Sequence, residues 1–201
     1  MKKPSPASGS RLKQLALVAG VSLLPVLAQA HHLPGTSASF TSGLVHPWLG
    51  LDHVLAMVAV GLWAGQLGGR SRWALPATFV GVMSLGGLLG MSGIPLPGVA
   101  AGILTSVVVL GLLIARTVRL PGFASLALVG GFALFHGHAH GSELPVGASA
   151  LAYGAGFVAA TVALHALGLA ASRLARVQPA FPTLRIAGAA IALAGLALGV
   201  L

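Results

Sequence analysis

The sequence predicts an all-α, polytopic membrane protein with six transmembrane helices after a cleaved N-terminal signal peptide. Hydrophobic residues make up 56% of the 201 residues and charged residues only 6%. The mean hydropathy of +0.96 lies outside the range of an ordinary soluble domain. Several apolar runs have the length of ~20 residues that a helix needs to cross a bilayer. The lipid bilayer is therefore the expected surrounding of this chain.

Residues 1–30 have the pattern of a secretory signal peptide. Basic residues precede an apolar core at 15–27, and Ala28-Gln29-Ala30 has the small-x-small form of a cleavage site. The alternative is an uncleaved first helix, because Pro25 and the short core fit either interpretation. Cleavage after Ala30 would leave a mature chain, 31–201, that begins at His31-His32 outside the cytoplasm.

Six apolar segments in the mature chain are the predicted spans of a single transmembrane domain. Pro47 can begin the first span because the N–H that proline lacks has no partner at a helix start. The Gly-Ile-Pro-Leu-Pro stretch at 93–97 separates the second span from the third, and Pro121-Gly122 marks a later turn. The predicted limits are 47–66, 73–91, 97–115, 122–138, 147–171 and 184–201.

The basic residues beyond the signal peptide predict the orientation of these spans. All of them lie in or beside the loops after the first, third and fifth spans, namely Arg70, Arg72, Arg116, Arg119, Arg173, Arg176 and Arg185. Cytoplasmic loops carry an excess of Lys and Arg. The three loops are therefore expected to face the cytoplasm of a bacterial inner membrane, with both mature termini periplasmic. The pI is about 12.0, but the basic residues lie between apolar runs rather than in one patch, which argues against nucleic-acid binding.

Most histidines and both acidic residues gather near the outer ends of the predicted spans. The stretch HPWLGLDH at 46–53 and the stretch FHGHAHGSE at 135–143 contain most of them. An ionisable group at the centre of a membrane helix costs at least ~2.5–3.5 kcal/mol, so such groups usually mark a pathway or site. Imidazole and carboxylate ligands, in a chain without cysteine, suit Ni²⁺, Co²⁺ or Zn²⁺. We therefore predict a divalent-metal site.

Helical geometry limits which residues of the first stretch can bind one ion. His46 and His53 share a helix face but lie roughly 10 Å apart along it. One ion could bind both only if the start of the helix is unwound. Asp52 or His53 together with a residue of the fourth span is the preferred pairing. A purely structural alternative is that Asp52 accepts an N–H from His53 and fixes packing.

The second stretch allows two geometries. In a helix His136 and His140 align while His138 faces away, whereas in an extended loop all three align. Gly137 and Gly141 indicate that the helix is ending here. His136 and His140 are therefore the preferred ligands, with His138 as an accessory.

Four further residues have weaker signals. His165 in the fifth span is either an accessory ligand or a core histidine hydrogen-bonded across helices. His31 and His32 fit ordinary residues of a mature terminus, although a free amine followed by histidine can chelate Ni²⁺ or Cu²⁺. Ser106 is interpreted as a helix-packing hydroxyl.

The two motifs together resemble those of the HupE/UreJ family. They read His46-Pro47-x-x-Gly50-x-Asp52-His53 and Phe135-His136-Gly137-x-Ala139-His140-Gly141-x-Glu143. The resemblance covers the whole mature chain and implies a membrane permease, not an enzyme, assigned to nickel or sometimes cobalt transport for hydrogenase and urease maturation. It implies metal-site roles for His46, Asp52, His53, His136, His140 and Glu143, while His138 occupies a variable position.

The expected function is transport of Ni²⁺, or Co²⁺, from the periplasm towards the cytoplasm. The metal is then the transported substrate, no permanent cofactor is expected, and nickel-enzyme maturation proteins are the expected partners at the cytoplasmic face. Three alternatives are a membrane component of a multi-subunit importer, a membrane-embedded zinc-dependent hydrolase with Glu143 as base, and a bis-histidine haem protein.

Overall fold

The computed structural model describes residues 40–144, 149–177 and 182–200, which form helices and short connections without a strand. The all-α prediction is thus confirmed for this part of the chain, while the predicted signal peptide, His31 and His32 lie outside it. In chain order the elements are α2 (Phe40–Val45), the 3₁₀ helix η1 (His46–Trp48), α3 (Leu51–Leu67), α4 (Ser71–Met91), α5 (Val99–Ala115), α6 (Gly122–Ser142), α7 (Ala150–Val177) and α8 (Thr183–Leu198).

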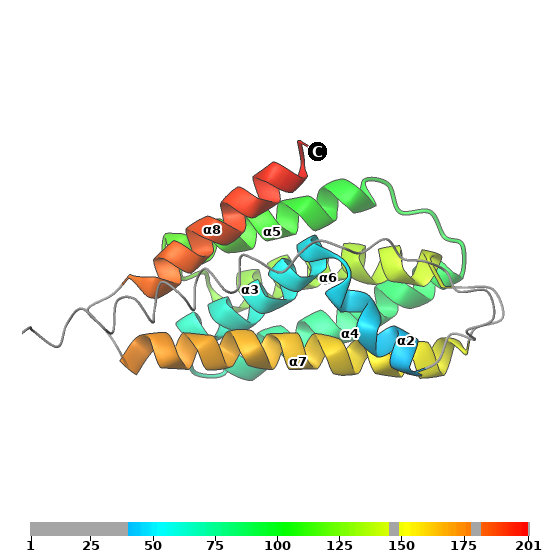
Figure 1. The fold of residues 1–201 in the computed structure, drawn as a ribbon, viewed down its shortest axis with the longest axis horizontal. Coiled ribbons are helices and arrows are strands. Elements are labelled where there is room, and N and C mark those ends of the chain that lie inside the picture. The colour runs from blue at the N-terminus through cyan, green and yellow to red at the C-terminus, as the bar shows by residue number, and fades with distance from the viewer. Residues whose placement is uncertain (1–39, 145–148, 178–181, 201) are drawn as a thin grey trace, which may run out of the picture. The chain divides into compact units, whose positions relative to one another are not determined.

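The longer helices pack in three close pairs, α4 with α6, α3 with α7, and α5 with α8, and α2 also packs against α7. Figure 1 shows α8 running alongside α5. The pairs meet around fully buried side chains that include Met57, Trp63, Phe79, Leu110 and Leu164. The interior is therefore a packed core, and it also contains buried histidines such as His136 and His140.

Glycines let the backbones of α4 and α6 touch. A Cβ added to Gly137 would strike the carbonyl of Met83, and one added to Gly141 would strike the carbonyl of Gly87. Small residues at such contacts are typical of membrane helix pairs. The sequence indicated that the helix is ending at these glycines, and α6 does end at Ser142, directly after Gly141, whereas Gly137 lies inside the helix. Their role is close packing.

The predicted first span is bent. The segment Phe40–Trp48 meets α3 at an angle of 85°. Pro47 lies in the first turn of η1, where the N–H that proline lacks would have no helical partner. Gly50 follows with an extended backbone, φ −103° and ψ 114°. A Cβ on Gly50 would lie only 2.8 Å from the ring Nδ1 of His53, so glycine at this position leaves room for that side chain.

Three described helices are long and apolar enough to cross a membrane: Ser71–Met91, Gly122–Ser142 and Ala150–Ala175. The bent pair makes a fourth if it is one broken span. The remaining apolar helices, α5 with 17 residues and α8 with 16, reach only about 25 Å, less than the hydrocarbon thickness of about 30 Å. The structure thus supports three or four spans rather than the six predicted.

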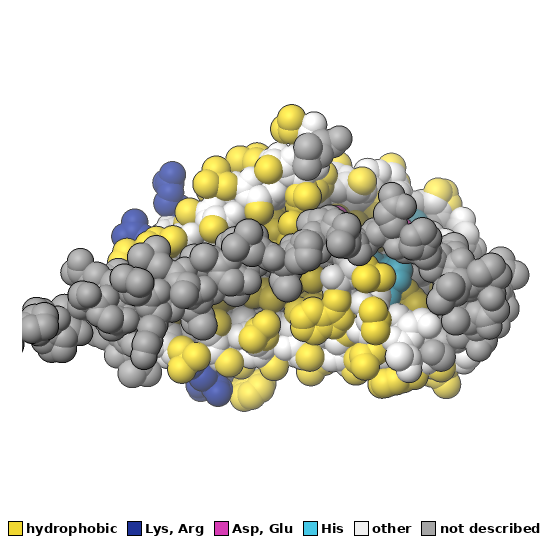
Figure 2. All heavy atoms as spheres, in the orientation of Figure 1, with side chains coloured by type: hydrophobic (Ala, Val, Ile, Leu, Met, Phe, Trp, Pro, Cys, Tyr) yellow, Lys and Arg dark blue, Asp and Glu magenta, His cyan; other side chains and the backbone are white. Residues whose placement is uncertain are grey.

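Arginines and histidines lie at opposite ends of the helices. Arg70 follows α3 and Arg72 lies in the first turn of α4, whereas His53 lies in the first turn of α3 and His140 in the last turn of α6. Figure 2 shows the visible Lys and Arg side chains at one end, histidine at the other, and hydrophobic side chains between them. The molecule therefore has a basic end and a histidine end.

Candidate metal site

The two motifs meet at the histidine end. The chain bends by 85° between the segment that ends in η1, which contains His46, and α3, which has Asp52 and His53 in its first turn. His136 and His140 lie one turn apart near the end of α6. Glu143 follows that helix as its C-cap residue. The structure thus brings together all six residues that the sequence predicts for the site.

The outer part of the site consists of His46, His140 and Glu143. One potential ligand atom from each lies within 4.8 Å of the others. The Glu143 Oε2 atom is 3.5 Å from Nε2 of His46 and 3.7 Å from Nδ1 of His140. Hydrogen bonding to His46 lowers the pKa of Glu143, outweighing the opposite effect of burial. The half-exposed carboxylate is therefore negatively charged at neutral pH.

Asp52 holds the ring of His53. Its Oδ1 atom accepts one hydrogen bond from the backbone N–H of His53 at 2.8 Å and a second from the ring at 2.7 Å. A carboxylate can only accept, so the ring donates its Nδ1–H and keeps its lone pair on Nε2. In metal sites such a carboxylate orients the histidine and raises its basicity. Asp52 therefore orients the ring of His53. The sequence suggested this contact only as a structural alternative to metal binding.

Four imidazole rings form a continuous series. The ring centroid of His140 is 4.9 Å from that of His46 and 4.3 Å from that of His53, and the centroids of His53 and His136 are 4.9 Å apart. The prediction that His46 and His53 can share a site only if the helix start is unwound is met by the bend between them. His140 lies between the two and contacts both.

Several nitrogens of this series are buried without a hydrogen-bond partner in the described part of the chain. They are Nε2 of His53, Nδ1 of His136, and both ring nitrogens of His140. Buried polar atoms are nearly always paired, and each exception calls for an explanation. Neutral imidazole lone pairs that face no donor are suited to binding a cation. The donor set of imidazole and carboxylate, without sulfur, fits Ni²⁺, Co²⁺ or Zn²⁺.

His138 lies outside this series. Its Nε2 atom is 2.7 Å from the carbonyl oxygen of Ile94, which belongs to the connection between α4 and α5. The ring therefore donates a hydrogen bond to a loop carbonyl on the opposite side of α6 from His140. This is a structural role, and it differs from the accessory-ligand role that the sequence suggested.

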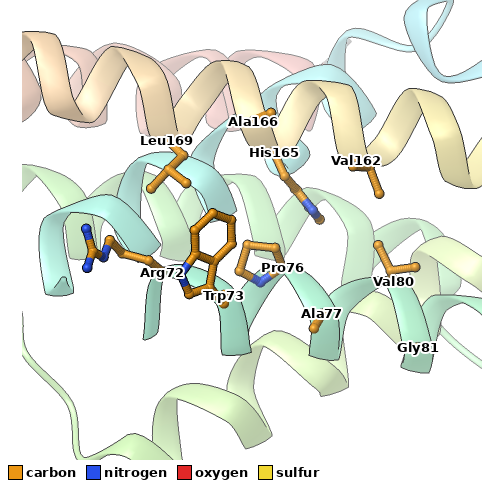
Figure 3. A pocket seen from close by; sticks show the side chains of 10 residues that line it. All are labelled: Arg72, Trp73, Pro76, Ala77, Val80, Gly81, Val162, His165, Ala166 and Leu169. Carbon is orange, nitrogen blue, oxygen red and sulfur yellow. The ribbon is translucent and has the colours of Figure 1, made fainter. Parts of the chain in front are cut away.

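His165 lies deeper, on α7, beyond Phe79. The Phe79 ring centroid is 5.6 Å from that of His136 and 5.1 Å from that of His165, so an aromatic ring separates the two histidines. In Figure 3 His165 points into a cavity of about 550 Å³ between α4 and α7, with Arg72 and Trp73 near one end. Neither His165 nitrogen has a hydrogen-bond partner among the described residues, unlike the hydrogen-bonded core histidine considered from the sequence.

Three contacts of the site were not predicted from the sequence. Phe157 packs on His140 with ring centroids 4.2 Å apart, and Tyr153 lies 5.7 Å from the His46 ring. The Ser106 hydroxyl oxygen lies 2.9 Å from Nε2 of His136, so the interpretation of this hydroxyl as a helix-packing group is incomplete. No local sequence pattern distinguishes these residues from other aromatic or hydroxyl residues of the apolar helices.

Comparison with known proteins places the chain in a family. Residues 18–198 match the family described as HupE / UreJ protein. The protein HupE of Rhizobium leguminosarum bv. viciae is 51% identical over 178 residues, which cover 87% of this chain and 91% of that protein. No solved structure matches the chain. The resemblance of the two histidine motifs is therefore confirmed across nearly the whole sequence, and the chain belongs to the HupE/UreJ family.

Proposed function

We propose that this chain carries a divalent transition-metal cation, Ni²⁺ or Co²⁺, across a bacterial inner membrane towards the cytoplasm. The HupE/UreJ family is associated with nickel and cobalt transport for hydrogenase and urease. Helices long and apolar enough to cross a membrane are consistent with a permease. On this proposal the metal is a substrate in transit, and cytoplasmic maturation proteins for nickel enzymes are its recipients.

One observation carries the proposal, namely that His140 lies between two groups of potential metal ligands. On one side it approaches His46 and Glu143, and on the other its ring contacts His53. A cation that exchanges one ligand at a time between neighbouring groups does not have to lose all of its ligands inside the protein. The negative charge of Glu143 attracts the cation at the partly exposed entrance, and Asp52 offsets positive charge deeper inside.

The direction of transport is inferred from the charge asymmetry of the molecule. Arginines gather at the end opposite the histidines (Figure 2). Because Lys and Arg are enriched on the cytoplasmic side of membrane proteins, the histidine end is assigned to the periplasm. His165 and the cavity that it lines lie farther along α7 towards the basic end, and so on the cytoplasmic side of Phe79.

Uptake by purified protein tests the proposal. Proteoliposomes that contain only this chain should accumulate radioactive nickel or cobalt faster than empty liposomes, and a His140→Ala variant should reduce this uptake. His138→Ala serves as a matched control on the same helix. Folded wild-type protein that moves neither metal would contradict the proposal and favour a multi-subunit importer. Hydrolytic turnover with bound zinc would favour the enzyme alternative.

A further inference from the structure

Ser106 is a buried hydroxyl beside one of the proposed ligands. It lies in the middle of α5, and both its side chain and that of His136 are fully buried, with 0% exposure. Its Oγ atom is 2.6 Å from the carbonyl oxygen of Ile103 and 2.9 Å from Nε2 of His136. The hydroxyl therefore makes two short contacts, one within its own helix and one across to α6.

The single hydrogen of the Ser106 hydroxyl determines the direction of both hydrogen bonds. A carbonyl can only accept, so the single hydroxyl hydrogen of Ser106 is donated to Ile103. The hydroxyl oxygen then has only lone pairs for His136. It must accept, and the ring must donate from Nε2. Neutral His136 is accordingly protonated at Nε2 and carries its lone pair at Nδ1.

The tautomer assigned to His136 is the opposite of the tautomer of His53, the neighbouring ring. Asp52 accepts the Nδ1–H of His53 and leaves its Nε2 free, whereas Ser106 accepts the Nε2–H of His136 and leaves its Nδ1 free. The two ring centroids are 4.9 Å apart. Each imidazole thus has one nitrogen held by a side chain and one with no hydrogen-bond partner among the residues that the structure describes.

We propose that Ser106 is a positioning residue that holds His136 in its Nε2–H form, so that the transported cation binds at Nδ1. The assignment of the cation rests on the proposed function, while the assignment of the proton does not. Outer partners of metal-binding histidines ordinarily fix the tautomer and the ring orientation. Ser106 has this role for His136, as Asp52 has for His53.

The tautomer can be measured without any metal. Protein labelled with ¹⁵N in its histidine rings, purified in detergent, gives ring nitrogen shifts that separate protonated from unprotonated positions, and loss of a signal in His136→Gln identifies His136. We expect wild-type His136 to be protonated at Nε2. Ser106→Ala, and Ser106→Cys with its weak acceptor sulfur, should introduce the Nδ1–H form, whereas Ser106→Thr should retain the wild-type signal.

The control for this measurement is Ser125→Ala. Ser125 is a buried hydroxyl on the same helix as His136, with a hydrogen bond to the carbonyl of Leu120, and its removal should leave the His136 signal unchanged. A wild-type His136 protonated at Nδ1, or an unchanged signal in both Ser106→Ala and Ser106→Cys, would overturn the proposal. The result does not depend on whether the protein transports nickel.

A binding measurement tests the second half of the proposal. Titration of purified protein with Ni²⁺ should give an affinity weakened by ~10-fold or more in Ser106→Ala, the usual effect of losing such a partner, and restored in Ser106→Thr. Unchanged nickel affinity, together with a changed tautomer, would exclude Nδ1 of His136 as the binding atom. Absence of nickel binding and uptake by the wild type would contradict the proposed function instead.

Discussion

The ring of His53 donates a hydrogen bond of 2.7 Å to the Oδ1 atom of Asp52, the residue directly before it. Adjacent residues on a helix do not normally face each other. Here the contact forms because Asp52 lies in the first turn of α3, and because Gly50 has no Cβ that would block either side chain. A local backbone feature therefore sets the orientation of a proposed metal ligand.

Replacing Asp52 by asparagine should weaken metal binding while preserving the fold. Asparagine has nearly the same size, but it lacks the negative charge that favours proton donation from His53 and that offsets the charge of the cation. We expect nickel uptake to fall by ~10-fold or more, as for other carboxylate partners of metal-binding histidines. Uptake assays at matched protein levels measure this. Wild-type uptake in Asp52→Asn would mean that the charge has no role.

Alanine at His136 or at His140 should lower uptake much more than alanine at His138. The first two rings contact His53, whereas His138 donates to the Ile94 carbonyl. His138→Ala should therefore mainly reduce the free energy of unfolding, by about 1 kcal/mol for one lost hydrogen bond. Uptake and thermal unfolding measured on the same preparations separate the two effects. Equal losses of uptake at all three positions would contradict the assignment.

The stability that Glu143 contributes should depend on pH. Its pKa is lowered in the folded protein, mainly by hydrogen bonding to His46. Such a group stabilises the fold above its unfolded pKa, and this stability is lost as the pH falls through the lower, folded value. Wild type should therefore melt at a higher temperature than Glu143→Gln at neutral pH, and the difference should vanish well below the ordinary value of 4.5. A difference independent of pH would contradict this prediction.

Two glycines of α4 should respond oppositely to alanine. A Cβ on Gly86 would strike the carbonyl of Leu134 on α6, whereas a Cβ on Gly81 would meet no described atom within 4 Å. Gly86→Ala should destabilise the protein by ~1–3 kcal/mol through overpacking. Gly81→Ala should be neutral or stabilise the helix by up to ~1 kcal/mol. Thermal unfolding of both variants in detergent measures the contrast, and equal stabilities would argue against the α4–α6 contact.

The proposed orientation can be tested with a reporter enzyme that is active only in the cytoplasm. Fused after Arg119, between α5 and α6, it should be active, because this loop carries two arginines at the basic end. Fused after Gly93, in the connection between α4 and α5, it should be silent. The opposite pattern would place the histidine end in the cytoplasm and reverse the proposed direction of transport.

That the residues of the two motifs lie together could be predicted in part, because each motif is local. The spacing of His136 and His140 places them on one helical face whatever surrounds the helix, and the structure has them in α6. The role of Ser106 could not be predicted, because its contact with His136 depends on how α5 packs against α6. A hydroxyl in an apolar helix has the same sequence signature with or without such a partner.

The fold was predicted in class but not in its spans. Hydropathy counts apolar residues along a run and is insensitive to a change of direction, so the 85° bend was missed even though Pro47 and Gly50 bracket it. Hydropathy also extends a span to the next polar residue. The structure ends α8 at Leu198 and starts α5 at Val99, after Gly98 with a positive φ of 73°, and both helices are therefore short for a bilayer.

The close pairing of helices has a mechanical consequence for the site. Asp52 and His53 belong to the α3–α7 pair, while His136 and His140 belong to the α4–α6 pair, whose backbones touch at glycines. Because these contacts are close, we expect each pair to move as a unit, and a tilt of one pair against the other would change the separation of His53 from His136 while leaving the hydrogen bond from His53 to Asp52 intact. The distance between two proposed metal ligands would then depend on the angle between two helix pairs.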